Sequence, residues 1–347
     1  MPEKTGSLKE RGAKGELQDT VHSSDDLPLW LAINDRPWTV PRNLLMESYQ
    51  RYGSISPLWQ SSEKYFMGTE GSEKLLSNLH RYASTDTLSQ YRKDVDVCRQ
   101  RGIEIIRLVD RKYPEQLRNL TETTIGPPLV LFKRGSLAVF DRCVAISGTR
   151  DCSFYGRNFA MEAAQALASK EYIVVSGLAR GIDEWAHFGA LKPKQGKTVA
   201  VLPWMEPLYP PEHNELAEDI QKRGGAIVSE HYRQSFGKGA RGKFVERNRI
   251  TSGLSLCVLA IESDEEGGTV HQVNLAMAQG KRVFALVPKG GERAKRGYEL
   301  FLKKGATPMK SIDEVLNYLK DMEHPVREQR MDSFYSNPQK ELDPGEM

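Results

Sequence analysis

The sequence predicts an α/β protein: a Rossmann-like, doubly wound, mostly parallel sheet, preceded by a small all-helical domain. Two observations carry this prediction. From residue 121 onward, short apolar segments rich in β-branched residues alternate with amphipathic helical segments, the pattern of a parallel sheet covered by helices on both faces. Before that point, segments such as 38–49, 72–82 and 88–101 carry apolar residues at three- and four-residue spacing, which is typical of helices.

The predicted elements follow one another in regular order along the chain. The strand segments are apolar over nearly their whole length, which fits strands buried on both faces of the sheet. A β-rich segment at 103–109 and a Gly-Pro-Pro turn at 126–128 precede them. Strands are expected at 129–132, 143–147, 172–176, 198–202, 226–229, 255–261 and 282–287, with helices at 158–169, 183–191, 212–223 and 270–279.

Four parts of the chain are expected: a disordered tail at 1–27, a helical, SAM-like domain at 28–120, a Rossmann-like domain at 121–322 and a polar tail at 323–347. The first part is rich in Lys, Glu, Gly and Ser and has no apolar core, which argues against a secretory signal. Nowhere does an apolar run approach the roughly 20 residues of a membrane span. We therefore expect a cytoplasmic protein without membrane contact.

Composition limits the chemistry. The formal net charge is only +3, so any affinity for nucleic acid must come from local clusters of charge. The four cysteines form no C-x-x-C pair and the seven histidines are scattered, so we expect reduced thiols, no metal site and no cofactor. The cysteines are Cys98, Cys143, Cys152 and Cys257.

Glycine-containing turns follow several predicted strands, at the edge where ligands bind in doubly wound sheets. Glycine lets the backbone approach an anion, and the amide groups of a following helix N-terminus point at it. Arginines can add bidentate charged bonds. We predict a phosphate-binding edge there, the alternative being that these glycines only form tight turns. The candidates are Gly148, Arg150, Ser176, Gly177, Arg180, Gly181, Gly267 and Gly268.

The span 233–249 holds six basic residues against one acid and contains three glycines and two phenylalanines. Backbone charges combined with rings that can stack on bases are what sequence-tolerant binding of single strands needs. We predict a flexible basic loop that binds single-stranded DNA. The alternatives are a solvated loop without a ligand and, for Phe244, a core residue that anchors the segment.

These segments together resemble the DNA-processing protein A family (DprA, also Smf). The resemblance runs from about residue 30 to 306, and its most specific block is S-G-L-A-R-G-I-D-E-W-A-H at 176–187. Further blocks are D-R-K-Y-P-E-Q-L at 110–117, A-I-S-G-T-R at 145–150, F-V-E-R-N-R-I-T-S-G-L-S at 244–255 and Q-G-K-R-V-F-A-L-V-P at 279–288.

The resemblance implies a protein that binds and protects single-stranded DNA, loads a RecA-type recombinase during natural transformation, forms a homodimer and catalyses no reaction. Besides the turn residues, it implies DNA contacts by Lys243, Phe244, Arg247, Asn248 and Arg249. The chain departs from the family pattern at Pro203-Trp204-Met205, where a glycine-rich turn is usual, and at Gln272, which stands in place of a threonine.

Two other functions stay open on the same fold. Glu262 near a Gly-Gly-Thr turn resembles the phosphoribohydrolases, which cleave the N-glycosidic bond of a nucleoside monophosphate. Their glutamate follows the glycines, whereas Glu262 precedes them. A sensor of a nucleotide signal in phage defence is the other alternative, although a basic loop suits a polymer better than a small ligand.

Overall fold

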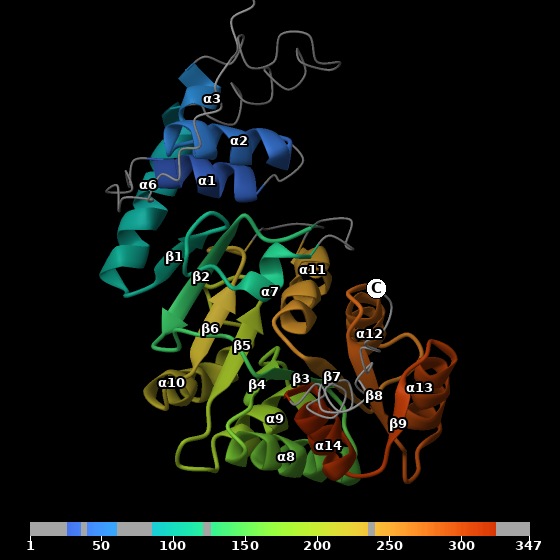
Figure 1. Ribbon diagram of the computed structural model, residues 1–347. Coiled ribbons are helices and arrows are strands. Elements are labelled where there is room, and N and C mark those ends of the chain that lie inside the picture. The colour runs from blue at the N-terminus through green and yellow to red at the C-terminus, as the bar shows by residue number, and fades with distance from the viewer. Residues whose placement is uncertain (1–25, 36–39, 61–84, 121–125, 235–239, 324–347) are drawn as a thin grey trace, which may run out of the picture.

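A computed structural model describes residues 26–35, 40–60, 85–120, 126–234 and 240–323 (Figure 1). The helix predicted at 72–82 and nearly all of the two predicted tails lie outside these residues. The helices are α1 (Leu27–Asn34), α2 (Arg42–Tyr52), α3 (Pro57–Gln60), α6 (Thr85–Gln100), α7 (Glu115–Arg118), α8 (Phe154–Ser169), α9 (Ile182–Ala190), α10 (Asn214–Lys222), α11 (Ala240–Gly253), α12 (Gly268–Ala278), α13 (Glu292–Lys303) and α14 (Ile312–Glu323). The strands are β1 (Glu104–Arg107), β2 (Val130–Gly135), β3 (Cys143–Gly148), β4 (Ile173–Ser176), β5 (Thr198–Leu202), β6 (Ala226–Ser229), β7 (Cys257–Ile261), β8 (Arg282–Leu286) and β9 (Thr307–Met309).

The strands form one nine-stranded sheet in the order β1-β2-β6-β5-β4-β3-β7-β8-β9. All neighbours from β6 to β9 are parallel, whereas β1 and β2 add antiparallel pairs at one edge. The predicted mostly parallel, doubly wound sheet is therefore confirmed. β1 lies in the segment predicted as all-helical, yet it pairs with β2 and belongs to the sheet; the domain boundary near residue 120 stays a prediction.

The central strands are buried on both faces, as their uninterrupted apolar sequence predicts. In β3, Val144 and Ile146 point to the side covered by α8, α9 and α14, while Ala145 between them packs with α12 and α13 on the other side. This alternation follows from the two-residue repeat of a strand. The carboxyl ends of β3, β4, β5 and β7 face a space between α11 and α12. The site lies in that space.

The N-terminal helices pack against the antiparallel edge of the sheet (Figure 1). α1 is buried almost over its whole length between α6 and β2, because it is apolar all round. Its last residue, Asn34, donates from Nδ2 to the Glu230 carbonyl at 2.7 Å and accepts the Val130 amide at 3.0 Å. A buried ion pair between Arg107 and Asp26, 3.1 Å apart, fixes the start of α1 to β1. Among the described residues, none of the helices has the length and apolar character of a membrane span.

Candidate nucleic-acid interface

A cleft of about 810 Å³ lies at the carboxyl ends of the parallel strands, between α11 and α12. The turns after β3 and β7 line it. A smaller side pocket adjoins it and shares Arg150, Ala179, Tyr209 and Phe244 with it, so the two form one extended groove. The predicted site residues that line the cleft are Gly148, Arg150, Phe244, Arg247, Asn248, Gly267 and Gly268.

Asp183, Arg247 and Gly177 form the floor of the groove, the first two in the cleft and Gly177 in the side pocket. A Cβ atom added at Gly177 would lie 1.9 Å from Nη1 of Arg247, so only a glycine lets the guanidinium lie against the turn after β4. Asp183 is buried and accepts the Gly177 amide at 3.1 Å. Burial raises the pKa of Asp183 against the opposing charge of Arg247. Asp183 Oδ1 and Arg247 Nε are buried atoms without a hydrogen-bond partner among the described residues.

The turn that leads into α9 is filled by the protein itself. Gly181 has a φ of +79°, and a Cβ there would meet the carbonyls of Thr149 and Arg150 at 2.5 Å. The Ile182 amide donates to the Thr149 carbonyl at 3.2 Å, and the hydroxyl of Ser176, a buried residue, donates to the Ile146 carbonyl. Ser176 and Gly181 therefore pack the fold rather than face the cleft.

Arg180 lines only the side pocket, where its exposed guanidinium pairs with Glu212. The helix terminus that does face the cleft is that of α12. Its N-cap residue, Gly267, provides no side-chain cap, and the Cα of Gly268 borders open space. Because the first amides of a helix lack acceptors within the helix and carry its positive dipole, this terminus suits an anion such as a phosphate.

Aromatic side chains form one wall of the cleft. The ring of Phe244 meets Trp204 edge-on with centroids 5.3 Å apart and Tyr209 with centroids 5.8 Å apart. The guanidinium of Arg150 lies over the Phe244 ring, 5.9 Å from its centroid. Tyr209 is 42% exposed, so its flat ring and the Arg150 guanidinium lie side by side in contact with solvent. The sequence did not single out Trp204, Tyr209 or Asp183 as site residues. Trp204 lies two residues after β5, whereas Tyr209 lies in the longer segment after β5 and Asp183 in the first turn of α9.

The predicted flexible basic loop is wrong for its second half, which is the helix α11. Residues 235–239, which include two of the three glycines of the predicted loop, lie outside the described residues. Helical spacing places Phe244, Arg247 and Asn248 on one face of α11, toward the cleft. Lys243 and Arg249 point the other way. The prediction placed all five residues on one DNA-binding surface, whereas the helix divides them between two faces.

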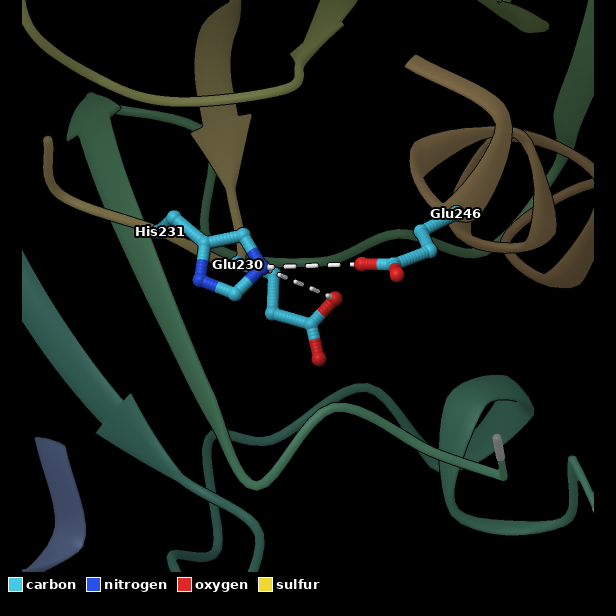
Figure 2. A group of neighbouring side chains, drawn as sticks. All are labelled: Glu230, His231 and Glu246. Atoms are coloured by element: carbon cyan, nitrogen blue, oxygen red, sulfur yellow. Dashed lines mark ion pairs between the residues drawn. The ribbon is translucent and has the colours of Figure 1, made fainter. Parts of the chain in front are cut away.

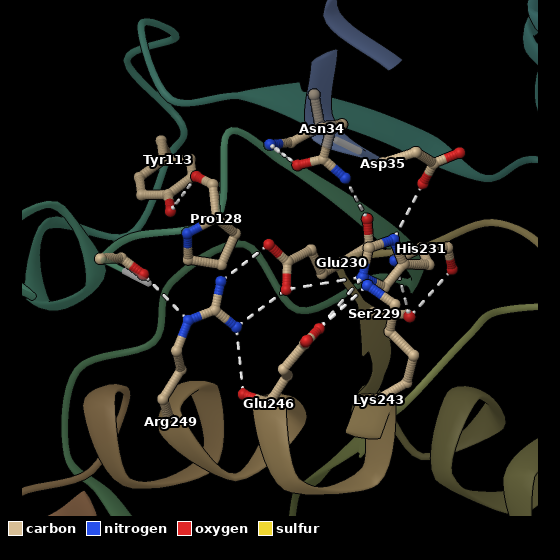
Figure 3. A network of polar contacts seen from close by, with 12 residues as sticks. Asn34, Asp35, Tyr113, Pro128, Ser229, Glu230, His231, Lys243, Glu246 and Arg249 are labelled. Carbon is tan, nitrogen blue, oxygen red and sulfur yellow. Dashed lines mark hydrogen bonds and ion pairs between the residues drawn. The ribbon is translucent and has the colours of Figure 1, made fainter. Parts of the chain in front are cut away.

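On that far side, Glu230, His231 and Glu246 lie together (Figure 2). Arg249 is only 1% exposed and binds the Glu230 carboxylate with Nη1 at 2.8 Å and Nη2 at 2.7 Å (Figure 3). Burial alone would raise the pKa of Glu230, but the Arg249 charge holds it at about 2. Lys243 pairs with Glu246 at 2.9 Å. Burial and pairing argue against the DNA contacts predicted for Arg249 and Lys243.

The departures from the family pattern are accommodated in this wall. Trp204 packs against Phe244, and its Nε1 donates to the Pro207 carbonyl at 2.8 Å. Gln272 is buried, and its Nε2 donates to the Asn248 carbonyl at 3.1 Å, which ties α12 to α11. Both residues therefore support Phe244 and Asn248, which line the cleft.

Glu262, the residue on which the enzyme alternative rests, does not line the cleft. Its carboxylate accepts the Ser153 amide at 2.8 Å and the Ser153 hydroxyl, at the point where α8 begins. Gly156 in the first turn of α8 lies against it. A carboxylate engaged in this way stabilises a helix start and is turned away from any ligand in the cleft.

The family model described as DNA recombination-mediator protein A matches residues 104–320. The chain belongs to the DprA/Smf family. It is 30% identical to the DNA processing protein DprA of Bacillus subtilis over 224 residues, which cover 64% of this chain and 73% of that protein. It is 34% identical to the protein Smf of Escherichia coli over 232 residues, which cover 66% of this chain and 60% of that protein.

Solved structures of DprA proteins share the fold. The crystal structure of DprA from Streptococcus pneumoniae superposes with a TM-score of 0.62 at 24% identity, over 84% of this chain and 95% of that one. DprA from Helicobacter pylori gives a TM-score of 0.52 at 25% identity, over 63% of this chain and all of that one. The latter structure is described as giving insight into a single-stranded DNA binding mode. The family model, which matches residues 104–320, spans the strands and helices that build the cleft.

Proposed function

We propose that the chain binds single-stranded DNA in the cleft and its side pocket, and that it acts as a DprA/Smf protein in DNA recombination. The observation that carries the proposal is the continuous groove, which is lined by both cationic and aromatic side chains. Arg150 lies over the Phe244 ring, Tyr209 packs against the same ring, and Arg247 lines the same cleft. The single-stranded DNA described for the Helicobacter pylori protein supports the same class of ligand.

The groove offers separate partners for the two parts of a nucleotide. Arg150, Arg247 and the N-terminus of α12 suit the phosphates, because each presents positive charge with hydrogen-bond donors. Phe244 and Tyr209 suit the bases, since a ring stacks on any base that is unpaired. A duplex keeps its bases stacked on one another, so it would reach only the phosphate partners. The groove therefore favours a single strand.

We also propose that the chain loads a RecA-type recombinase onto the bound strand and forms a homodimer, as its resemblance to the family implies. Co-elution of the chain with a RecA-type recombinase on oligothymidylate would support the first, and a molar mass of two chains in light scattering the second. We propose no catalysis, because the Glu262 carboxylate is engaged by Ser153. Absence of nucleoside release from nucleoside monophosphates tests that statement.

The decisive experiment is a fluorescence anisotropy titration with labelled oligothymidylate, with duplex DNA and thymidine monophosphate as competitors. We expect the unlabelled single strand to compete well, duplex weakly and the mononucleotide hardly at all. Arg150→Ala should weaken binding about tenfold or more, as loss of a charged hydrogen bond implies. Arg282→Ala is the matched control, since Arg282 is an exposed arginine at the amino end of β8, away from the carboxyl ends of the strands that form the cleft. Competition by the mononucleotide at similar concentration would instead favour a nucleotide sensor.

A further inference from the structure

The end of β6 and the middle of α11 bring an imidazole and two carboxylates together behind the cleft wall (Figure 2). His231 Nε2 lies 3.8 Å from Glu230 Oε2 and 4.0 Å from Glu246 Oε2. One ligand atom from each residue lies within 4.8 Å of the others. The His231 side chain is only 7% exposed, so the group is shielded from solvent on the histidine side.

His231 is oriented through its other ring nitrogen. Nδ1 lies 2.9 Å from Asp35 Oδ1, and a carboxylate oxygen accepts the hydrogen bond that Nδ1 donates (Figure 3). Nε2 is therefore the ring nitrogen that is turned toward the two glutamates.

His231 Nε2 faces two carboxylate oxygens. Among the described residues it has no hydrogen-bond partner, and it is buried. A buried nitrogen opposed by anions is unfavourable unless positive charge lies between them. A cation at the meeting point of the three atoms supplies that charge.

We propose that His231 Nε2, Glu230 and Glu246 bind a divalent transition-metal ion, with zinc as the preferred ion. Imidazole nitrogen and carboxylate oxygen are ligands of zinc, at about 2.0–2.2 Å. Two ligands of a tetrahedral ion are then about 3.4 Å apart, so the observed separations of 3.8 and 4.0 Å close by a few tenths of an ångström on binding. Asp35 takes the place of the carboxylate that orients a metal-bound histidine through its second nitrogen.

Two cations adjoin the site and set its strength. Arg249 holds Glu230 ionised and leaves lone pairs on its oxygens, because each oxygen accepts one bond from the guanidinium. Lys243 binds Glu246 Oε2, the same oxygen that faces His231, so its ammonium competes with the ion. Lys243 is carried on a flexible stem and is 17% exposed, which lets it withdraw to solvent when the ion binds.

The site would link the DNA groove to the rest of the fold. Glu246 lies on the back of α11, whose front carries Phe244, Arg247 and Asn248. An ion held by Glu246 and by the two residues after β6 would fix α11 against the sheet. It would also connect α11, through His231 and Asp35, to the end of α1.

The test is calorimetric titration of the chelator-treated full chain with zinc chloride. We expect one ion per chain at this site, with a Kd of about 10 μM or tighter. His231→Gln and Glu246→Gln should each weaken it at least tenfold, and Lys243→Met should tighten it. Glu215→Gln, an exposed glutamate on α10, is the matched control and should change nothing.

Circular dichroism melts with and without zinc accompany each variant. Zinc should raise the melting temperature of the wild type and of Glu215→Gln but not of Glu246→Gln, which lies on a half-buried helix face and should fold. If the wild type binds no zinc below about 100 μM, the proposal is wrong, and a proton on Nε2 fills the place of the ion. Equal zinc affinity of wild type and both ligand variants would also overturn it, because the ion would then lie elsewhere.

Discussion

Replacing Gly177 by alanine tests the floor of the DNA groove with a single methyl group. The added Cβ would lie 1.9 Å from Nη1 and 2.5 Å from Cζ of Arg247. The obstructing atoms are the far end of a flexible side chain, so the guanidinium has to leave its position while the backbone stays. Loss of a charged hydrogen bond to phosphate costs about 1.5–3 kcal/mol, which corresponds to about a tenfold to 150-fold weaker affinity for single-stranded DNA.

The assay is anisotropy with labelled oligothymidylate, paired with a thermal melt of each variant. Gly242→Ala is the matched control, because a Cβ at this position of α11 meets nothing within 4 Å and the residue does not line the cleft. Gly148→Ala gives the contrasting case, since its Cβ would lie 1.9 Å from the backbone carbonyl of Ile261 and should lower the melting temperature sharply. Wild-type affinity in a normally folded Gly177→Ala protein would refute the role assigned to Arg247.

Three further outcomes are expected. Raising salt from about 50 to about 200 mM should weaken single-strand binding by one to several orders of magnitude, if roughly four to eight phosphates are contacted; a flat response would argue against phosphate contacts. Phe244→Ala should reduce single-strand affinity about fivefold to a hundredfold and hardly change duplex affinity, whereas equal losses with a lower melting point would show that Phe244 only packs against Trp204 and Tyr209. Burial, assisted by His213 and Arg247, lowers the pKa of His187 to about 3, so the unfolded state takes up the proton first as pH falls below about 6.5. The free energy of unfolding should therefore lose about 1.4 kcal/mol per pH unit from this residue, a slope that urea titrations of His187→Leu should lack.

The order of strands and helices could be predicted from the sequence because each parallel strand is an unbroken apolar run bounded by turns. The two faces of α11 could not. Its glycines and basic residues suggested a loop, and the partners that order it, Glu230 for Arg249 and the buried surroundings of Ile250, come from distant parts of the fold. A helix then sends neighbouring basic residues to opposite sides, which no count of charges reveals.

The glycines of the strand-end turns show a second limit. The pattern predicted that they approach a ligand, but Gly148 and Gly181 are required by contacts with the protein's own carbonyls. Only a structure distinguishes these two uses of a missing side chain. The sequence predicted no metal site, because no C-x-x-C pair occurs and the histidines are scattered. Only the fold brings Glu246 beside Glu230 and His231.

Hydrogen–deuterium exchange with and without oligothymidylate tests most directly whether the cleft is the DNA site. We expect slower exchange at the start of α12, around Gly268 and Thr269, and in the turn that carries Arg150, because these amides lie at the cleft where the strand would be held. Exchange on α8 and at the amino ends of the strands, on the side of the sheet away from the cleft, should stay unchanged. Protection confined to those regions, with none at the start of α12 or after β3, would contradict the assignment of the cleft as the DNA-binding site.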